Sequence, residues 1–145
     1  MAYLVDTNVA SRRILPADPQ FPLIVAALTK LHNQGESLHV TPQVLIEFHA
    51  LATRPLVANG WGMSPAQALL EGRKIESIFP ILPDTAAIYP LWRNLVGHHQ
   101  IMGRQVFDAR LVAVTQAHQI THILTMNPGD FRRFPGIIVV EPSSV

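Results

Sequence analysis

The stretch YLVDTNV, residues 3–9, indicates how the chain begins to fold. Its apolar half, YLV, has a preference for β-structure, and Asp6, Thr7 and Asn8 are residue types that start a turn and cap a helix. A strand that leads directly into a helix is the repeating unit of α/β folds. Asp6 would then lie at the carboxyl end of the first strand, where open α/β sheets bind their ligands.

Short apolar runs alternate with helical patterns along the rest of the chain. We expect further strands at residues 38–40, 81–82, 120–125 and 137–140. We expect the later helices at residues 21–31, 42–54, 65–79, 89–99 and 106–117. Prolines at positions 80, 83 and 90 restrict the strand at 81–82 to a very short piece. The predicted fold class is therefore α/β, a three-layer α/β/α sandwich around a central parallel sheet of about five short strands.

The composition is typical of one compact domain. A chain of 145 residues can bury one sizeable core, and its 48% apolar and 14% charged content argues against extensive disorder. The absence of cysteine excludes a disulfide framework, a thiol nucleophile and a zinc ribbon. No charged leader precedes a hydrophobic stretch, and no run approaches the roughly 20 apolar residues of a membrane span. We expect a cytoplasmic protein with no membrane partner.

The net charge is close to neutral. A formal charge of +1, from 11 Lys and Arg against 10 Asp and Glu, is too balanced for broad electrostatic attraction to nucleic acid. Any such binding must depend on local basic clusters. The candidates are Arg12/Arg13, Arg73/Lys74, Arg104/Arg110 and Arg132/Arg133.

Four polar sites are embedded in apolar sequence. They are Asp6 in YLVDTNV, Glu47 in VLIEFHAL, Asp108 in VFDARLVAV, and Asn127 with Asp130 in ILTMNPGDF. Ionised side chains are costly to place beside a core unless they are paired or bound to a metal. Because a divalent cation can serve several carboxylates at once, this pattern indicates metal-dependent phosphate chemistry.

The expected fold can bring these sites together. The turns after the first strand and after the strand at 120–125 both lie at the carboxyl edge of the sheet. Glu47 lies at the edge of its helix's apolar stripe and therefore points toward the sheet. Asp108 shares a helical face with Leu111 and Val112, so its carboxylate can enter the same crevice.

Each acidic site also has an ordinary structural explanation. Asp6 could cap a helix after a strand, Asp108 could cap a helix that starts at Ala109, and residues 127–130 could form a turn. Glu47 resists such an explanation, because a mid-helix residue cannot cap its own helix and Arg54, seven residues on, is beyond the usual helical ion-pair spacing. The coincidence of all four sites favours a shared functional role.

These motifs, in this order, resemble a known family. DTNV at 6–9, the isolated Glu47, FDARLVAV at 107–114 and LTMNPGDFRRF at 124–134 are similar to the motifs of PIN-domain nucleases, specifically the small VapC-type toxin branch. The resemblance spans Tyr3 to about Val140 and implies a single PIN-like domain over residues 1–145.

The resemblance also implies roles for individual residues. Asp6, Glu47 and Asp108 match the acidic residues that hold Mg²⁺ or Mn²⁺, and Asn8 and Thr125 match supporting polar positions. The fourth acidic position of the family varies between Asp and Asn. This chain has Asn127 there and Asp130 three residues later, so either residue could complete the site, and a second metal is left open.

The chemistry that suits such a cluster is phosphodiester hydrolysis. A bound divalent ion lowers the pKa of water and offsets charge on the reacting phosphate. The resemblance implies an RNA substrate, a homodimer, and a small antitoxin protein that inserts into the active-site groove. The basic residues nearest the acidic sites are expected to hold flanking phosphates; they are Arg104, Arg110, Arg132 and Arg133.

Two other functions fit part of the pattern. A phosphatase with Asp6 as nucleophile would form an acyl phosphate. Haloacid-dehalogenase-like phosphatases use a second Asp two residues on, where this chain has Asn8. A non-catalytic binding module would keep the fold and lose turnover, and its only support in the sequence is Asn127 in place of an acid.

Overall fold

A four-stranded parallel sheet forms the centre of the molecule. The computed structural model describes residues 1–145. The strands are β1 (Ala2–Val5), β2 (Ser37–His39), β3 (His122–Leu124) and β4 (Ile138–Val140). Their order across the sheet is β2-β1-β3-β4, and each neighbouring pair is parallel.

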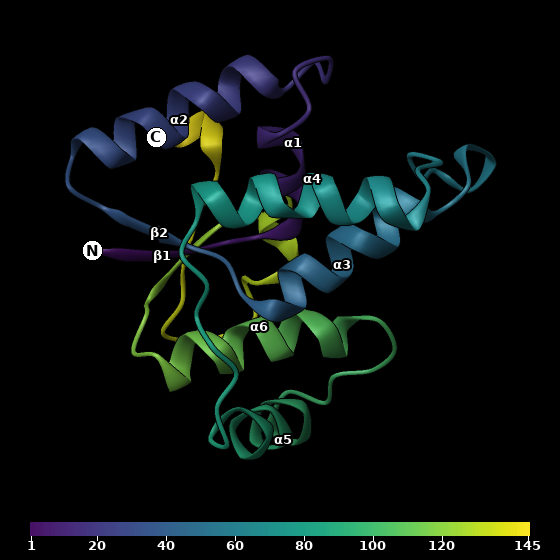
Figure 1. Cartoon of the computed structure of the whole chain (residues 1–145). Helices are drawn as coiled ribbons and strands as arrows, with labels where there is room; N and C mark the ends of the chain where they lie inside the picture. Colours follow the sequence, from purple (N-terminus) through teal and green to yellow (C-terminus); the bar gives the residue numbers. More distant parts are fainter.

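Helices cover both faces of this sheet. They are α1 (Thr7–Arg13), α2 (Phe21–Asn33), α3 (Pro42–Thr53), α4 (Pro65–Ile78), α5 (Ile88–His98) and α6 (Gln105–Ala117). Figure 1 shows α1, α2 and α4 on one side of the sheet and α5 and α6 on the other, while α3 packs against α4 and α1. The predicted three-layer α/β/α architecture is therefore confirmed. No helix combines the length and the apolar character that crossing a membrane requires.

The prediction of about five strands was too high by one. Residues 81–82 form only an isolated parallel bridge, in which Ile81 is paired with Val40. The Val40 N–H donates to the Pro80 carbonyl at 3.0 Å, and the Leu82 N–H donates to the Val40 carbonyl at 2.8 Å. The next hydrogen bonds of this ladder would need the N–H groups of residues 80 and 42, and both are prolines, so the pairing ends after one residue.

Capping residues in the sequence set the starts of α3 and α4. The Thr41 hydroxyl accepts a hydrogen bond from the Val44 N–H at 3.1 Å and so caps α3. Ser64 and Gln67 form a reciprocal capping box at the start of α4. Proline follows the capping residue in both helices, a position where its missing N–H costs nothing.

The two central strands hold the core and end at the same edge. Leu4 and Val5 of β1 and Ile123 and Leu124 of β3 are all fully buried. Val5 is in register with Leu124. The residues that follow, Asp6 and Thr125, are therefore placed side by side at the carboxyl edge of the sheet.

Candidate active site

Asp6 is fixed at the end of β1 by three hydrogen bonds to its carboxylate. One oxygen, Oδ1, accepts from the Thr7 N–H at 2.7 Å and so caps α1. The other, Oδ2, accepts from the Thr125 hydroxyl at 2.7 Å and from the Asn8 amide at 3.1 Å. The side chain is therefore both a helix cap and the centre of a polar network that a cap alone does not need.

Thr125 and Asn8 connect the ends of β1 and β3. The Thr125 hydroxyl is fully buried, and it also accepts from the Asn8 amide at 3.3 Å and from the Asn127 N–H at 3.0 Å. The side-chain oxygen of Asn8, Oδ1, accepts from the Met126 N–H at 3.0 Å. These bonds hold the turn after β3 against the start of α1, so the supporting positions expected from the sequence lie around Asp6.

Glu47 reaches the same site from α3. Its Oε2 accepts from the Thr7 hydroxyl at 2.7 Å, and its Oε1 accepts from the Gln43 amide at 2.9 Å. Gln43 also donates to the Phe107 carbonyl at 2.8 Å and thereby connects α3 to α6. Gln43 was missed in the sequence, although its position four residues before Glu47 places both on one helical face.

Asp108 and Asp130 face the site without a structural role as caps. Helix α6 begins at Gln105, so Asp108 lies inside its first turn and does not cap a helix that starts at Ala109. Asp130 is exposed in a 3₁₀ turn, Pro128–Asp130, and the Asn127 side chain before it makes no capping hydrogen bond. The backbone turn expected at 127–130 is present, but the side chains of Asn127 and Asp130 are left free for other contacts.

A cleft of about 660 Å³ joins these groups. The acidic and amide residues that line it are Asp6, Asn8, Glu47, Asp108, Asn127 and Asp130. Thr125 lies beneath it and bonds to Asp6. The structure therefore brings together every acidic and supporting polar residue selected from the sequence, while their roles in catalysis stay predictions.

Burial and mutual repulsion raise the pKa of two of the carboxyl groups. Burial raises the pKa of Asp6 to about 6, against the lowering effect of its bonds to Thr125 and Thr7. Burial also raises the pKa of Asp108 to about 7, and the nearby charges of Asp130, Asp6 and Glu47 add to this effect. The cleft thus contains negative charges that destabilise one another.

These acids have no cationic partner. Of the ten acidic residues, five are in ion pairs with an arginine, a lysine or the N-terminus. Four of the remaining five are Asp6, Glu47, Asp108 and Asp130. Unpaired carboxylates beside a core are the setting in which a divalent cation lowers the electrostatic cost.

The donor set fits a hydrated cation better than a fully protein-bound one. No three His, Asp or Glu side chains are grouped closely enough to hold a metal ion by themselves. Mg²⁺ is commonly held by one or two carboxylates and keeps several waters. The hydrogen bonds to Asp6 and Glu47 fix both carboxylates in place, as the partners of ligand residues do in metal sites.

The metal-free protein is expected to lose stability as the pH rises. The pKa values of Asp6 and Asp108, about 6 and about 7 in the folded chain, compare with about 3.9 for an unperturbed Asp. From about pH 4 to about pH 7 the folded state holds protons that the unfolded state has released, so the free energy of unfolding falls as the pH rises. For Asp6 the loss is on the order of 2 kcal/mol.

Chemical denaturation with a chelator present, at about pH 5 and about pH 8, measures this change. Asp108→Asn provides the control, because its amide does not ionise. The variant should lose less stability than the wild type over the same interval. An equal loss in both proteins would contradict the raised pKa of Asp108.

The arginines are arranged differently from the expectation. Of the four selected, only Arg104 lines the cleft. Arg110 donates to Gln43 at 3.0 Å and pairs with Asp84 at 3.2 Å, and Arg132 pairs with Glu141 at 3.7 Å. Arg133 is exposed and does not line the cleft.

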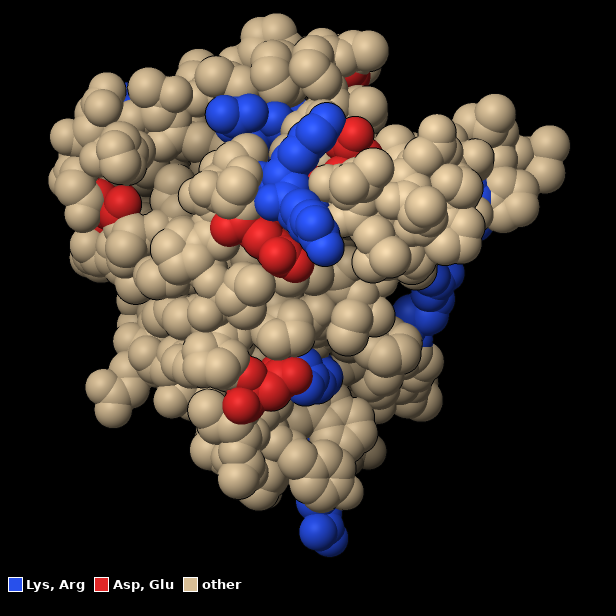
Figure 2. Space-filling view, in the orientation of Figure 1, with Lys and Arg blue, Asp and Glu red and all other residues tan.

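Two other arginines, Arg12 and Arg54, line the cleft instead. Arg12 was noted in the sequence only as part of a basic pair, and it donates to the Asn8 carbonyl one helical turn earlier at 2.8 Å. Arg54 follows the last residue of α3. Figure 2 shows charged side chains in a few small groups within a largely uncharged surface on the face that carries α4. Any contact with a polyanion therefore depends on these local arginines.

Comparisons with known proteins relate this architecture to one family. A model of the PIN domain matches residues 3–137. VapBC2 from Rickettsia felis, bound to a DNA fragment from its promoter, has a similar fold, with a TM-score of 0.70, 18% identity and coverage of 97% of this chain and 98% of that chain. FitAcB from Neisseria gonorrhoeae gives a TM-score of 0.68 at 21% identity, with 99% of each chain covered.

A third similar structure is VapC20 from Mycobacterium tuberculosis, a toxin that cleaves the sarcin-ricin loop. It gives a TM-score of 0.57 at 18% identity and covers 83% of this chain and 86% of that chain. The comparison with curated proteins by sequence gives no match. At these identities the structural likeness establishes the fold.

Proposed function

The chain belongs to the PIN domain family, and from this premise we propose that it is a divalent-metal-dependent endoribonuclease that hydrolyses RNA phosphodiester bonds. One observation carries the proposal: four carboxylates from four separate segments line one cleft, and none has a cationic partner. A constellation of this kind suits phosphoryl chemistry, in which catalysis depends on positioning and on stabilisation of charge.

In this proposal Asp6, Glu47 and Asp108 would hold a hydrated metal ion, with waters completing the contacts that the three carboxylates do not make directly. Either Asp130 or Asn127 would complete the site. When bound, Mg²⁺ or Mn²⁺ would supply a water of lowered pKa and would offset negative charge on the phosphate oxygens. The protein's own contribution is orientation, since Thr125, Thr7 and Asn8 fix the Asp6 carboxylate while Thr7 and Gln43 fix that of Glu47.

RNA is proposed as the substrate on the basis of family membership and of the likeness to VapC20. The arginines of the cleft suit the phosphates on either side of the cut bond. Arg54 and Arg104 line the cleft without an intramolecular ion pair, so their charges are available to a polyanion. Contacts of this kind hold the backbone and carry no sequence information.

The proposal is tested by incubating labelled RNA, and DNA of the same sequence, with purified protein. Internal cuts in RNA are expected with Mg²⁺ or Mn²⁺ and none with a chelator. A phosphatase that uses Asp6 as nucleophile would instead form a trapped phospho-aspartate and leave RNA intact. Against that alternative, Asp6 is only 7% exposed, and both of its carboxylate oxygens accept hydrogen bonds from the protein.

Thr125→Val is expected to reduce cleavage while leaving the fold intact. Valine has nearly the same shape but cannot donate to the Asp6 carboxylate, which the Thr125 hydroxyl contacts at 2.7 Å. Loss of a residue that orients a metal ligand typically reduces metal affinity or activity by about 10- to 100-fold. Single-turnover cleavage rates across a Mn²⁺ titration measure the effect. Thr125→Ser, which keeps the hydroxyl, should retain most of the activity, and equal losses in both variants would contradict this role.

The proposal extends to partners of the kind seen in the similar structures. As a toxin of a toxin-antitoxin pair, the protein would be a homodimer that is inhibited by a small antitoxin inserted into the cleft. A shallow hollow of about 350 Å³ between α3 and α4, with exposed Ile46 and Leu69 at its edge, provides an apolar surface for such an assembly. Light scattering measures the oligomeric state directly.

A further inference from the structure

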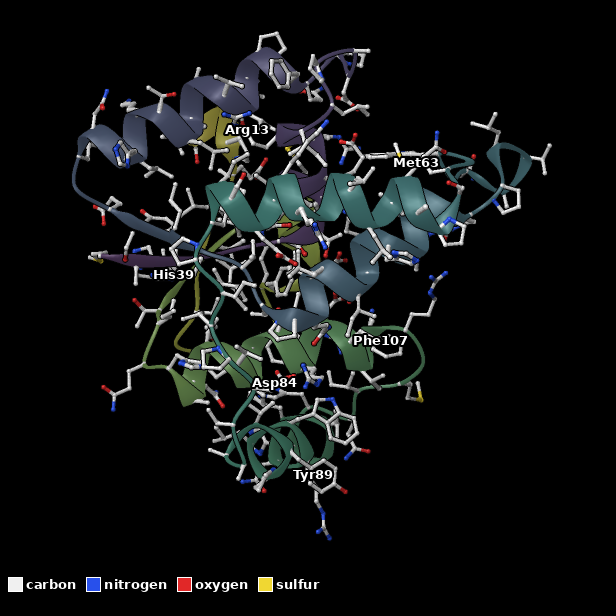
Figure 3. All side chains as sticks on the ribbon, viewed as in Figure 1. Arg13, His39, Met63, Asp84, Tyr89 and Phe107 are labelled. Atoms are coloured by element: carbon white, nitrogen blue, oxygen red, sulfur yellow. The ribbon has the colours of Figure 1, made fainter.

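Exposed aromatic side chains lie at the cleft and on the helix beside it. Phe107 lines the cleft next to Asp108, and its side chain is 55% exposed. Tyr89 on α5 is 65% exposed and stacks on Trp92, with ring centroids 5.8 Å apart and an interplanar angle of 25°. Figure 3 shows Phe107 near the first turn of α6 and Tyr89 on α5 below it. Phe107 and Tyr89 lie outside the core, whereas Trp92 is half-buried and packs against it.

The backbone around these rings is fixed by hydrogen bonds. The Trp92 indole N–H donates to the Val106 carbonyl at 2.8 Å, which connects α5 to the start of α6. The Phe107 carbonyl accepts from Gln43, the residue that also holds Glu47. The Phe107 backbone is therefore held beside the acidic site, and its exposed ring has no aromatic partner in the protein.

Positive charge accompanies the aromatic residues. Arg104 lies three residues before Phe107, is exposed and lines the cleft. Arg93 follows Trp92 and is also exposed. Neither arginine is in an ion pair. Aromatic faces combined with unpaired cations are the arrangement by which proteins bind single-stranded nucleic acid.

We propose that Phe107 is a stacking platform for an unpaired RNA base next to the phosphate that is cut. Tyr89 and the exposed part of Trp92 extend this surface along the RNA strand. The proposal rests on the ribonuclease function proposed above and adds to it the side chain that would hold a base beside the cut phosphate. A base within a duplex is stacked on its neighbours, and its face is not available to a side chain.

The test is the equilibrium binding of a short fluorescent single-stranded RNA, measured by anisotropy in an Asp108→Asn background that keeps the RNA intact. Phe107→Ala is expected to weaken binding by about 5- to 100-fold, the range for loss of one base–aromatic stack. RNA binding by Phe107→Leu should also be weak, because leucine is apolar but has no π-face. Phe107→Trp should bind RNA as tightly as the protein that keeps Phe107. Val57→Ala, which removes an exposed apolar side chain outside the cleft, should have no effect.

Two further RNAs sharpen the result. The same RNA strand with abasic nucleotides should bind the protein that keeps Phe107 and the Phe107→Ala variant with similar affinity. The annealed RNA duplex should bind both proteins weakly. Unchanged affinity in Phe107→Ala, or full restoration by Phe107→Leu, would overturn the stacking role. If the stacking role fails in this way and the wild-type protein, which keeps Asp108, still cleaves RNA, the ribonuclease proposal stands. If the wild-type protein neither binds nor cleaves RNA, both proposals fail.

Discussion

Asp6→Asn and Asp108→Asn should each abolish most metal-dependent RNA cleavage. Each substitution removes a charged oxygen ligand but keeps the shape of the side chain. The contribution of a bound metal ion to a transition state is several kcal/mol, which corresponds to a rate loss of about 10³-fold. The Asp6 variant also replaces one of the two oxygens that accept from Thr7, Thr125 and Asn8 by an NH₂ group, whereas Asp108 has no ion-pair partner to lose.

The matched control is Glu76→Gln. Glu76 is the fifth acidic residue without an ion pair, and it lies on α4 outside the cleft. Its substitution also removes one negative charge, so it tests whether net charge alone affects RNA cleavage. Initial cleavage rates of the folded variants are the measurement. A wild-type rate in either cleft variant would exclude that carboxylate from the chemistry.

Gly60→Ala should strongly destabilise the fold. A methyl group at this buried glycine would lie 2.0 Å from the Arg54 carbonyl oxygen, which is far inside van der Waals contact. The loop cannot easily move away, because the Gly60 N–H donates to Pro55 and the Gly62 N–H donates to Arg54. Trp61, between the two glycines, packs edge-on against the core residue Phe48 with centroids 5.7 Å apart. We expect a loss of at least about 3 kcal/mol in the free energy of unfolding.

Gly97→Ala provides the matched control for this substitution. A methyl group at Gly97 would meet no atom within 4 Å, and the residue lies within α5. Alanine is favoured over glycine in a helix by up to about 1 kcal/mol, so this variant should be as stable as the wild type or more so. Urea denaturation measures both proteins. Wild-type stability in Gly60→Ala would show that the loop after α3 adapts.

The sequence was most informative about residues whose position follows from the direction of the strands before them. Asp6 and Thr125 directly follow two apolar strands, and parallel strands place such residues at one edge. Glu47 stood out because a mid-helix acid beside an apolar stripe has few structural roles. Local patterns of this kind are visible without tertiary information.

The parts that the sequence did not predict depend on how helices pack. Arg110 follows Asp108 closely in the chain, but α6 directs it to Gln43 and Asp84 outside the cleft. Arg54, far from any acidic motif, reaches the cleft because α3 ends beside it. Helix orientation fixes these positions, and residue spacing alone does not determine it.

The very short strand expected at 81–82 is reduced further, to a single bridge. Both residues are apolar and β-prone, but a strand also needs N–H donors along its partner edge. Pro80 and Pro42 lack the N–H groups that would extend the pairing, and one bridge to Val40 is left.

Calorimetric titration of the purified protein with Mn²⁺ tests the central claim most directly, because the claim is that the unpaired carboxylates of one cleft form a divalent-metal site. The wild type and Glu76→Gln are predicted to bind at least one ion per chain. Asp6→Asn and Asp108→Asn are predicted to bind it much more weakly. A folded wild-type protein that binds no Mn²⁺, or all four proteins binding it equally, would contradict the account.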